Sequence, residues 1–349
     1  MKIVVTGASG NVGSAVVERL AEESGIDSIV GVCRRPHDWR PDKTTWAWAD
    51  VSQDDLAAVF EGADAVVHLA WLFQPTRAPG VTWAANVVGT KRVLDAVVAA
   101  GVPAVVVASS VGAYSPRTST DPVDESWPTD GAPTAAYSRE KAYVERLLDV
   151  HEREHPDCRV VRLRPVFIFS ERASIEQRRL FLGPFVPHAV LAPGRVPLLP
   201  LPRELVLQAL HARDVADAFA RAATGPARGA YNLAPTDVLT PPDLARLLRG
   251  RWLPTPARAL RAAMGTAFRL RAIPAAPELF DLVMAIPVLD AGRAKRELGW
   301  SPRASSAGAV EAFLRGVHAD DPVPTPPLVH STSGPVRSHE LSTGVGRRP

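Results

Sequence analysis

Thr6-Gly7-Ala8-Ser9-Gly10-Asn11-Val12-Gly13 follows a short apolar run at residues 3–6 and opens an amphipathic segment. Glycines at this spacing permit a tight turn, let the backbone approach a pyrophosphate and let a helix pack against a strand. The N-terminus of that helix supplies amide donors and a positive dipole. A plain strand-to-helix turn does not require three glycines, so the stretch predicts a dinucleotide-binding loop. Its expected cofactor contacts are Gly7, Ser9, Gly10, Asn11, Val12 and Gly13.

Short β-branched runs alternate with longer amphipathic segments from this loop to about residue 165. This alternation is typical of a parallel sheet with helices on both faces. We expect strands at residues 3–6, 28–33, 46–49, 65–69, 104–108 and 159–163, and helices at 12–23, 54–61, 82–100 and 135–155. Six strands with crossovers predict an α/β fold, a Rossmann-type doubly wound parallel sheet.

The regular alternation breaks after residue 165. Residues 183–202 carry six prolines and predict an irregular excursion over the site. A run at 206–210, a helix from 214, a strand at 231–233 and helices at 242–249, 256–270, 290–298 and 306–317 predict a smaller, mostly helical substrate lobe. The final residues are rich in Pro, Ser and Gly, which is typical of disorder. The expected domains are 1–165 for the dinucleotide, 166–320 for the substrate with some return to the core sheet, and 321–349 as a disordered tail.

Bulk composition narrows the class of protein. The net charge is only +3 and no run of five basic residues occurs, so the arginines indicate a solvated surface rather than a nucleic-acid site. Cys33 and Cys158 lack CxxC spacing, which predicts neither a disulfide framework nor a metal site and fits a reducing cytoplasm. No apolar run approaches the roughly 20 residues of a membrane span, and the first strand leaves no room for a signal peptide. We therefore expect a cytoplasmic protein without a membrane partner.

The end of the second expected strand bears on the choice of dinucleotide. About 20 residues beyond the glycine loop, this fold places an acid for the ribose 2′-hydroxyl or an arginine for a 2′-phosphate. The sequence has Cys33-Arg34-Arg35 there, and no acid before Asp38. A guanidinium binds phosphate oxygens with two parallel donors. We predict that Arg34 favours NADP(H) over NAD(H), and the alternative is that Arg34 and Arg35 are surface charges.

Tyr137-Ser138-Arg139-Glu140-Lys141 lies 27 residues after Ser110, which follows the expected strand at 104–108. On a helix, positions i and i+4 share one face, so the Tyr137 phenol and the Lys141 ammonium point the same way. A cation beside a phenol favours the phenolate and lowers its pKa. Oxidation of an alcohol needs such a base, and reduction of a carbonyl needs the same tyrosine as an acid. Ser110, Tyr137 and Lys141 are the predicted catalytic residues.

With the glycine loop, Ser110 and Tyr137-x-x-x-Lys141 in place, the chain resembles the short-chain dehydrogenase/reductase superfamily. More specifically, it resembles the extended branch called the NAD-dependent epimerase/dehydratase family, over about residues 1–317. Matches in the C-terminal lobe include residues 211–216, 231–233 and 298–302. The family often dimerises through the two long helices expected at 82–100 and 135–155, so a homodimer is expected by analogy alone.

The resemblance also implies roles for residues outside the motifs. Asp50 and Val51 match positions that contact the adenine, and Leu69 and Ala70 match backbone that lines the nicotinamide side. The helix that carries Asn86 matches one that steadies the site. These residues, with Pro165 at the end of the sixth strand and with Tyr137 and Lys141 again, complete the implied cofactor set. His68, His211 and Tyr114 are expected to be structural.

The substrate pattern departs from relatives that act on nucleotide-activated sugars. Residues 166–169, 199–202 and 205–208 lack the side chains expected to hold a sugar diphosphate. Trp71, Leu72, Phe73 and Trp83 are apolar instead, which favours an uncharged carbonyl or alcohol substrate, with core packing as the alternative.

Three function classes follow. The first is an NAD(P)-dependent oxidoreductase with net hydride transfer. The second is a nucleotide-sugar epimerase or dehydratase that recycles its cofactor. The third is a non-catalytic dinucleotide sensor or RNA-binding relative, which predicts a broken catalytic triad. The sequence retains all three triad residues.

Overall fold

The computed structural model describes residues 1–72, 77–174, 176–178, 194–317, 325 and 328. Its centre is a seven-stranded sheet in the order β10-β6-β5-β4-β1-β2-β3, in which every neighbouring pair is parallel. The strands are β1 (Lys2–Thr6), β2 (Ser28–Cys33), β3 (Thr44–Trp48), β4 (Ala65–His68), β5 (Ala104–Ala108), β6 (Arg159–Pro165) and β10 (Gly229–Leu233). The predicted doubly wound sheet is confirmed. It has a seventh strand, because the run at 231–233, expected as a strand of the segment that returns in part to the core sheet, pairs with β6.

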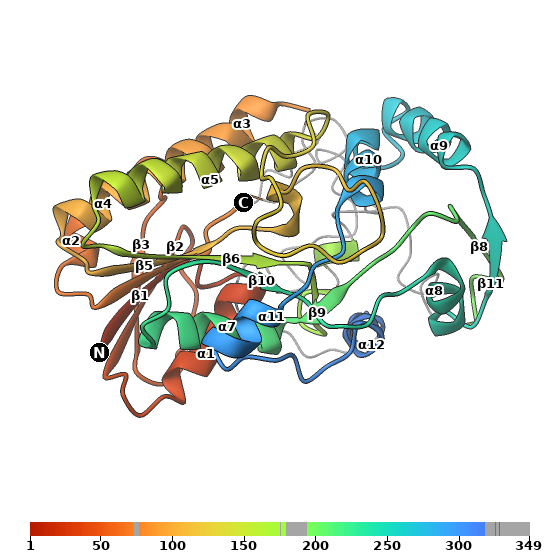
Figure 1. The fold of residues 1–349 in the computed structure, drawn as a ribbon. Helices are drawn as coiled ribbons and strands as arrows, with labels where there is room; N and C mark the ends of the chain where they lie inside the picture. The colour runs from red at the N-terminus through yellow and green to blue at the C-terminus, as the bar shows by residue number, and fades with distance from the viewer. Residues whose placement is uncertain (73–76, 175, 179–193, 318–324, 326–327, 329–349) are drawn as a thin grey trace.

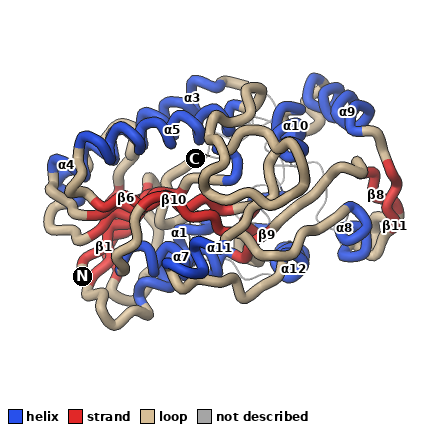
Figure 2. Tube along the Cα trace, viewed as in Figure 1, coloured by secondary structure: helices blue, strands red, loops and turns tan. Residues whose placement is uncertain are grey.

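Helices cover both faces of this sheet (Figures 1 and 2). One face carries α3 (Pro79–Trp83), α4 (Gly89–Ala99) and α5 (Ala136–Glu154), and the other carries α1 (Asn11–Ala21) and α7 (Ala212–Thr224). Burial on both sides explains the unbroken apolar runs of the strands, since Ile3, Val4 and Val5 are all fully buried. A π-helix, η1 (Ala84–Val88), joins α3 to α4 within the helix expected at 82–100.

The remaining helices are α8 (Pro241–Leu247), α9 (Ala257–Arg269), α10 (Pro277–Ala285), α11 (Gly292–Glu297) and α12 (Ser306–Gly316). α8, α9 and α10 lie away from the sheet, at the right of Figure 1, whereas α11 lies beside α7 and contacts β10. Two short parallel pairs accompany them, β7 (Phe167–Phe169) with β9 (Ala209–His211), and β8 (Leu198–Leu201) with β11 (Arg251–Pro254). α10, β7, β8 and β11 were not predicted from the sequence.

Two expectations fall largely outside the described residues. The excursion expected at 183–202 is described only from residue 194, where β8 is found. The tail expected at 321–349 is described only at Thr325 and Leu328, and both are buried. Thr325 donates a hydrogen bond to the Ser9 carbonyl at 2.9 Å.

A further short helix is α2 (Ala57–Phe60). Among the helices of the described residues, none is long and apolar enough to cross a bilayer.

The strand order reverses direction between β1 and β4. In open α/β sheets, ligands bind outside the carboxyl ends of the strands at such a switch point. The fold therefore directs attention to the residues that follow β1, β4 and their neighbours.

Candidate active site

A cavity of about 420 Å³ lies at the carboxyl ends of the strands. Segments that follow six of the seven sheet strands contribute to its wall, so residues far apart in sequence meet there. Of the predicted site residues, all but Asn86 line it: Gly7, Ser9, Gly10, Asn11, Val12, Gly13, Arg34, Asp50, Val51, Leu69, Ala70, Ser110, Tyr137, Lys141 and Pro165.

The glycine loop brings three backbone segments into close contact. Gly7 has φ of +71°, and a Cβ there would lie 2.7 Å from the Ala70 nitrogen. A Cβ on Gly13 would lie 2.1 Å from the Gly7 carbonyl oxygen. Only glycine fits either place, and the open backbone faces the cavity at the start of α1. This geometry fits a dinucleotide pyrophosphate, with amides of the loop and of the α1 N-terminus as donors.

Arg34 follows β2 and lines the same cavity. Its side chain is 52% exposed and its guanidinium nitrogen lies 3.9 Å from an Asp50 carboxylate oxygen. The contact is long and open to solvent, so it leaves the Arg34 donors able to bind another anion. Asp50 also accepts hydrogen bonds from the backbone and hydroxyl of Ser52.

Ser110 and Tyr137 form a hydrogen-bonded pair. The Tyr137 hydroxyl donates to Ser110 Oγ at 2.9 Å, and the Gly112 amide donates to the same oxygen at 3.0 Å. Ser110 Oγ thus accepts two hydrogen bonds, which leaves its own proton to donate. Gly112 is a residue that the sequence did not single out. A Cβ there would lie 2.7 Å from the Tyr137 ring, so glycine is what lets the ring lie on the turn after β5.

Lys141 lies one turn further along α5 and is buried. Its Nζ donates to the Ala108 carbonyl at 2.7 Å. The same Nζ lies 3.3 Å from the centroid of the Trp71 ring and 6.0 Å from the centroid of the Tyr137 ring. The ammonium is therefore directed at the end of β5 and at Trp71 rather than at the phenol.

The protonation states differ from the expectation for a lysine-activated phenol. Burial raises the pKa of Tyr137 to about 12, although the hydrogen bond with Ser110 opposes this. Burial lowers the pKa of Lys141 to about 7, against the opposing charges of Glu145 and Glu140. Tyr137 is consequently a protonated phenol throughout the ordinary pH range. That form suits a proton donor.

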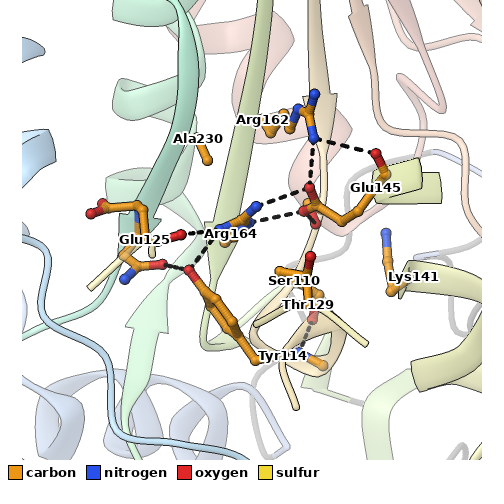
Figure 3. Close-up of polar contacts among 12 residues, drawn as sticks. Ser110, Tyr114, Glu125, Thr129, Lys141, Glu145, Arg162, Arg164 and Ala230 are labelled. Carbon is orange, nitrogen blue, oxygen red and sulfur yellow. Dashed lines mark hydrogen bonds and ion pairs between the residues drawn. The ribbon is translucent and has the colours of Figure 1, made fainter. Parts of the chain in front are cut away.

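A buried ion-pair network around Glu145 lies near Ser110 and Lys141 (Figure 3). Glu145 lies four residues after Lys141 on α5 and binds Arg164 of β6 through both carboxylate oxygens, each at 2.9 Å. It also binds Arg162 and accepts a hydrogen bond from Ser109, the neighbour of Ser110. These contacts with Arg164 and Arg162 lower the pKa of Glu145 to about 2, although burial opposes them. The network fixes α5 against β5 and β6, and so fixes Lys141 relative to Ser110.

Asn86 lies on the π-helix and is fully buried, away from the cavity. Its side-chain oxygen accepts from the Leu72 amide at 2.6 Å, and its nitrogen donates to the Leu72 carbonyl at 3.2 Å and to Glu140 at 2.7 Å. A π-turn redirects side chains and is frequent at functional sites. Asn86 thus clamps the segment after β4 to α5, as a support and not as a cavity wall.

The wall beyond Tyr137 is mostly apolar. It is made by Trp71 and Leu72 after β4, by β7, by Leu279, Leu282 and Val283 of α10, and by Ile286, which follows α10. Glu176 and Gln177 are polar residues that also line the cavity. Among the described lining residues the cations are Arg34 and Lys141. Phe73 lies outside the described residues, and Trp83 packs on Tyr143 instead of lining the cavity.

The three residues expected to be structural all make buried or partly buried hydrogen bonds. His68 lies between the hydroxyls of Thr6 at 2.7 Å and Thr90 at 2.9 Å. The Tyr114 hydroxyl donates to Asn232 and accepts from Arg164. His211 caps α7 and contacts Glu171. Each has a packing role that needs no catalytic explanation.

Comparison with known proteins gives the fold and site a wider context. A model of the NAD dependent epimerase/dehydratase family matches residues 3–234. UDP-glucose 4-epimerase of Mycolicibacterium smegmatis is 28% identical over 324 residues, which cover 89% of this chain and 96% of that protein. L-arabinose 1-dehydrogenase (NAD(P)(+)) of Haloferax volcanii is 36% identical over 121 residues, but these cover only 31% of this chain and 41% of that relative.

Solved structures agree on the fold. UDP-glucose 4-epimerase of Thermotoga maritima with UDP-glucose superposes with a TM-score of 0.69 at 19% identity, over 91% of this chain and 99% of that one. MoeE5 in complex with UDP-glucuronic acid and NAD gives a TM-score of 0.66 at 20% identity over the same shares. At such identities the likeness extends to the fold alone.

Proposed function

The chain belongs to the NAD dependent epimerase/dehydratase family, and within it we propose an NADP(H)-dependent oxidoreductase that acts on an uncharged, largely apolar carbonyl or alcohol. The observation that carries this proposal is the hydrogen-bonded Ser110–Tyr137 pair at a cavity whose wall beyond Tyr137 is mostly apolar. When bound, the nicotinamide coenzyme supplies or accepts the hydride. The residues of this chain bind, orient and move the proton.

Proton transfer follows from the hydrogen bonds of the pair. Ser110 donates its free hydroxyl proton to the substrate oxygen and orients it. Tyr137, protonated because burial raises its pKa to about 12, donates its proton to the same oxygen as a carbonyl is reduced. When Lys141 is protonated, its ammonium, 6.0 Å from the centroid of the Tyr137 ring, adds positive potential near the reacting oxygen. A protonated Tyr137 is the form that carbonyl reduction requires.

Coenzyme binding is assigned to two parts of the cavity. The glycine loop, where Gly7 and Gly13 leave the backbone bare, holds the pyrophosphate. Arg34, at the end of β2 and largely exposed, holds a 2′-phosphate, which favours NADP(H). Asp50 and Val51 lie beside it for the adenosine.

A second candidate is a nucleotide-sugar epimerase or dehydratase with a recycled coenzyme. The match to the mycobacterial epimerase over 89% of the chain favours it. Against it stands the cavity, because a sugar diphosphate carries two charges that need cationic or amide donors. Among described lining residues, Arg34 and Lys141 are the cations. Arg34 lies at the coenzyme end of the cavity, and Lys141 lies at the acid/base centre. A non-catalytic sensor is disfavoured by the assembled Ser110–Tyr137 pair.

The test is turnover of NADPH with a panel of aliphatic and aromatic aldehydes and ketones, in wild type and in Tyr137→Phe. Removal of the proton donor should lower kcat/KM by about a hundredfold or more. Tyr143→Phe is the matched control, because Tyr143 is an exposed tyrosine of the same helix. Absence of activity with every member of the panel, or equal activity in wild type and Tyr137→Phe, contradicts the proposal.

A further inference from the structure

Trp71 makes contact with the acid/base centre in a way that its sequence position did not signal. It follows β4 by three residues and lines the cavity. The Lys141 ammonium lies 3.3 Å from the centroid of its ring. The Trp71 and Tyr137 rings meet edge to face, with centroids 5.9 Å apart and planes at 79°. The indole of Trp71 therefore contacts both Lys141 and Tyr137.

Lys141 needs such a neighbour. It is 3% exposed, and among the described residues its Nζ donates a hydrogen bond to the Ala108 carbonyl. Within the part of the chain that the structure describes, no carboxylate lies within ion-pair distance of Nζ. A buried charge is costly unless it is compensated, and the negative face of an indole compensates an ammonium when both are removed from water.

The charged and titratable groups that face Lys141 are already engaged with other partners. Glu140 accepts hydrogen bonds from Thr82 and Asn86. Glu145 binds Arg162 and Arg164.

On the sheet side, burial and the charge of Lys141 lower the pKa of His68 to about 3, so this imidazole is neutral. Tyr137 is a neutral phenol. The two glutamates act on the ammonium only through space, whereas the Ala108 carbonyl and the Trp71 ring are in direct contact with it.

The placement of the ring agrees with this role. The backbone of the next residue, Leu72, is clamped by Asn86 through both its amide and its carbonyl. The indole Nε1 is buried and has no hydrogen-bond partner among the described residues. An unpaired buried N–H is unfavourable, so packing and the ammonium, rather than an indole hydrogen bond, set the orientation of the ring.

We propose that Trp71 is a positioning residue whose indole face holds Lys141 as an ammonium at the Ala108 carbonyl, beside the Tyr137 phenol. The role of Trp71 is inferred from its cation–π contact with Lys141. That Lys141 matters for catalysis rests on the proposed function. Because burial brings the pKa of Lys141 to about 7, a small change in local potential changes its charge at neutral pH. Loss of a desolvated cation–π contact corresponds to about one pH unit or more.

The test measures the charge of Lys141 directly and needs no substrate. The full-length protein is acetylated with trace acetic anhydride across a range of pH, and each lysine peptide is quantified by mass spectrometry. The chain has five lysines, Lys2, Lys43, Lys91, Lys141 and Lys295, so the exposed Lys43 and Lys91 serve as internal references. The pH midpoint of labelling reports the pKa, whereas the plateau rate reports access, so an opened cavity is not mistaken for a shifted pKa.

Trp71→Leu should lower the Lys141 midpoint by about one pH unit or more. Trp71→Phe, which keeps an aromatic face, should restore much of that difference. Trp83→Leu is the matched control, because Trp83 is exposed and packs on Tyr143, and it should leave the midpoint unchanged.

Trp71→Met is the second variant if Trp71→Leu does not unfold cooperatively, since a flexible thioether refills the space without an aromatic face. A Lys141 midpoint equal to that of wild type in the folded Leu or Met variant overturns the proposal. So does a Phe variant that behaves like Leu. Because labelling involves no turnover, either result leaves the proposed oxidoreductase function to its own test.

Discussion

Arg34 is the residue on which the choice of coenzyme depends. Its guanidinium lines the cavity, and Asp50 at 3.9 Å does not immobilise it. Arg34→Asp replaces the cation that would bind the 2′-phosphate with a carboxylate, which repels it. Because a hydrogen bond to a charged group contributes about 1.5–3 kcal/mol, KM for NADPH should rise about tenfold to a hundredfold, with KM for NADH little changed.

Steady-state kinetics with both coenzymes on one substrate measure this. Arg153→Asp, a change at an exposed arginine near the end of α5, controls for the altered net charge. If the ratio of the two KM values is the same in wild type and Arg34→Asp, then Arg34 does not read the 2′-phosphate.

Sequence was sufficient for some residues of the site and insufficient for others. Ser110, Tyr137 and the glycines could be predicted, because a helical i,i+4 spacing and a glycine loop after a strand are local patterns. Trp71 was predicted only as an apolar wall. Its contact with Lys141 joins residues 70 positions apart, and the orientation of a ring relative to an ammonium leaves no pattern in the sequence. The raised pKa of Tyr137 likewise depends on burial rather than on spacing.

The junction of α5 with β6 is the element-scale feature that supports the site. Glu145 is completely buried and faces Arg164 and Arg162. Glu145→Leu leaves Arg164 buried without its carboxylate. Breaking one side of a buried pair typically lowers the free energy of unfolding by about 3–5 kcal/mol. Urea unfolding should show a loss of that size.

Two controls distinguish the buried Glu145–Arg164 ion pair from an exposed salt bridge. The double variant Glu145→Leu/Arg164→Leu should lose less than the sum of the two single variants, since neither charge is then left alone. Lys91→Ala removes an exposed i,i+4 partner of Asp95 and should cost at most about 1 kcal/mol. Additive losses in the double variant would show that the two side chains are not coupled.

At the scale of elements, the expected helices and sheet strands follow the periodicity of their apolar residues, within a few residues at the ends. α10 was not expected because Pro277 begins it after an irregular Pro- and Ala-rich segment. It matters for function, since Leu279, Leu282 and Val283 line the cavity. The short pairs β7–β9 and β8–β11 depend on tertiary context, and three or four residues give too little pattern to detect.

Stability of the whole molecule should depend on pH through His68. This imidazole is buried between Thr6 and Thr90 and its pKa is lowered to about 3, mainly by burial. Below its unfolded pKa of about 6.5 the unfolded chain binds a proton that the folded chain does not. The free energy of unfolding should therefore fall as pH falls from about 6.5, by up to about 1.4 kcal/mol per pH unit from this group.

Urea unfolding at several pH values between about 6.5 and 4.5 checks the slope. His68→Gln should reduce the slope, whereas His155→Gln, at a half-buried histidine after α5, should retain it. Below about pH 4.3, Glu145 adds a further loss, because its folded pKa of about 2 lies below the unfolded value. A wild-type slope in His68→Gln would assign the pH dependence to other groups.

The whole molecule combines a fold shared with nucleotide-sugar enzymes and a cavity whose described wall is mostly apolar beyond Tyr137. The fold could be predicted, because alternating strands and helices with a glycine loop have few solutions. The substrate could not, because it depends on side chains brought together from β4, β7 and α10. We therefore propose that a hydride passes from the coenzyme to a carbonyl substrate, with Tyr137 as the proton donor.

The most direct test follows deuterium from NADPH labelled at its transferable position into the product of an accepted carbonyl substrate. We expect one deuterium on the carbinol carbon per NADPH oxidised in wild type, and loss of this transfer in Tyr137→Phe while coenzyme binding is retained. Conversion of a nucleotide sugar with no net oxidation of coenzyme, together with no deuterium in any carbonyl product, would contradict it.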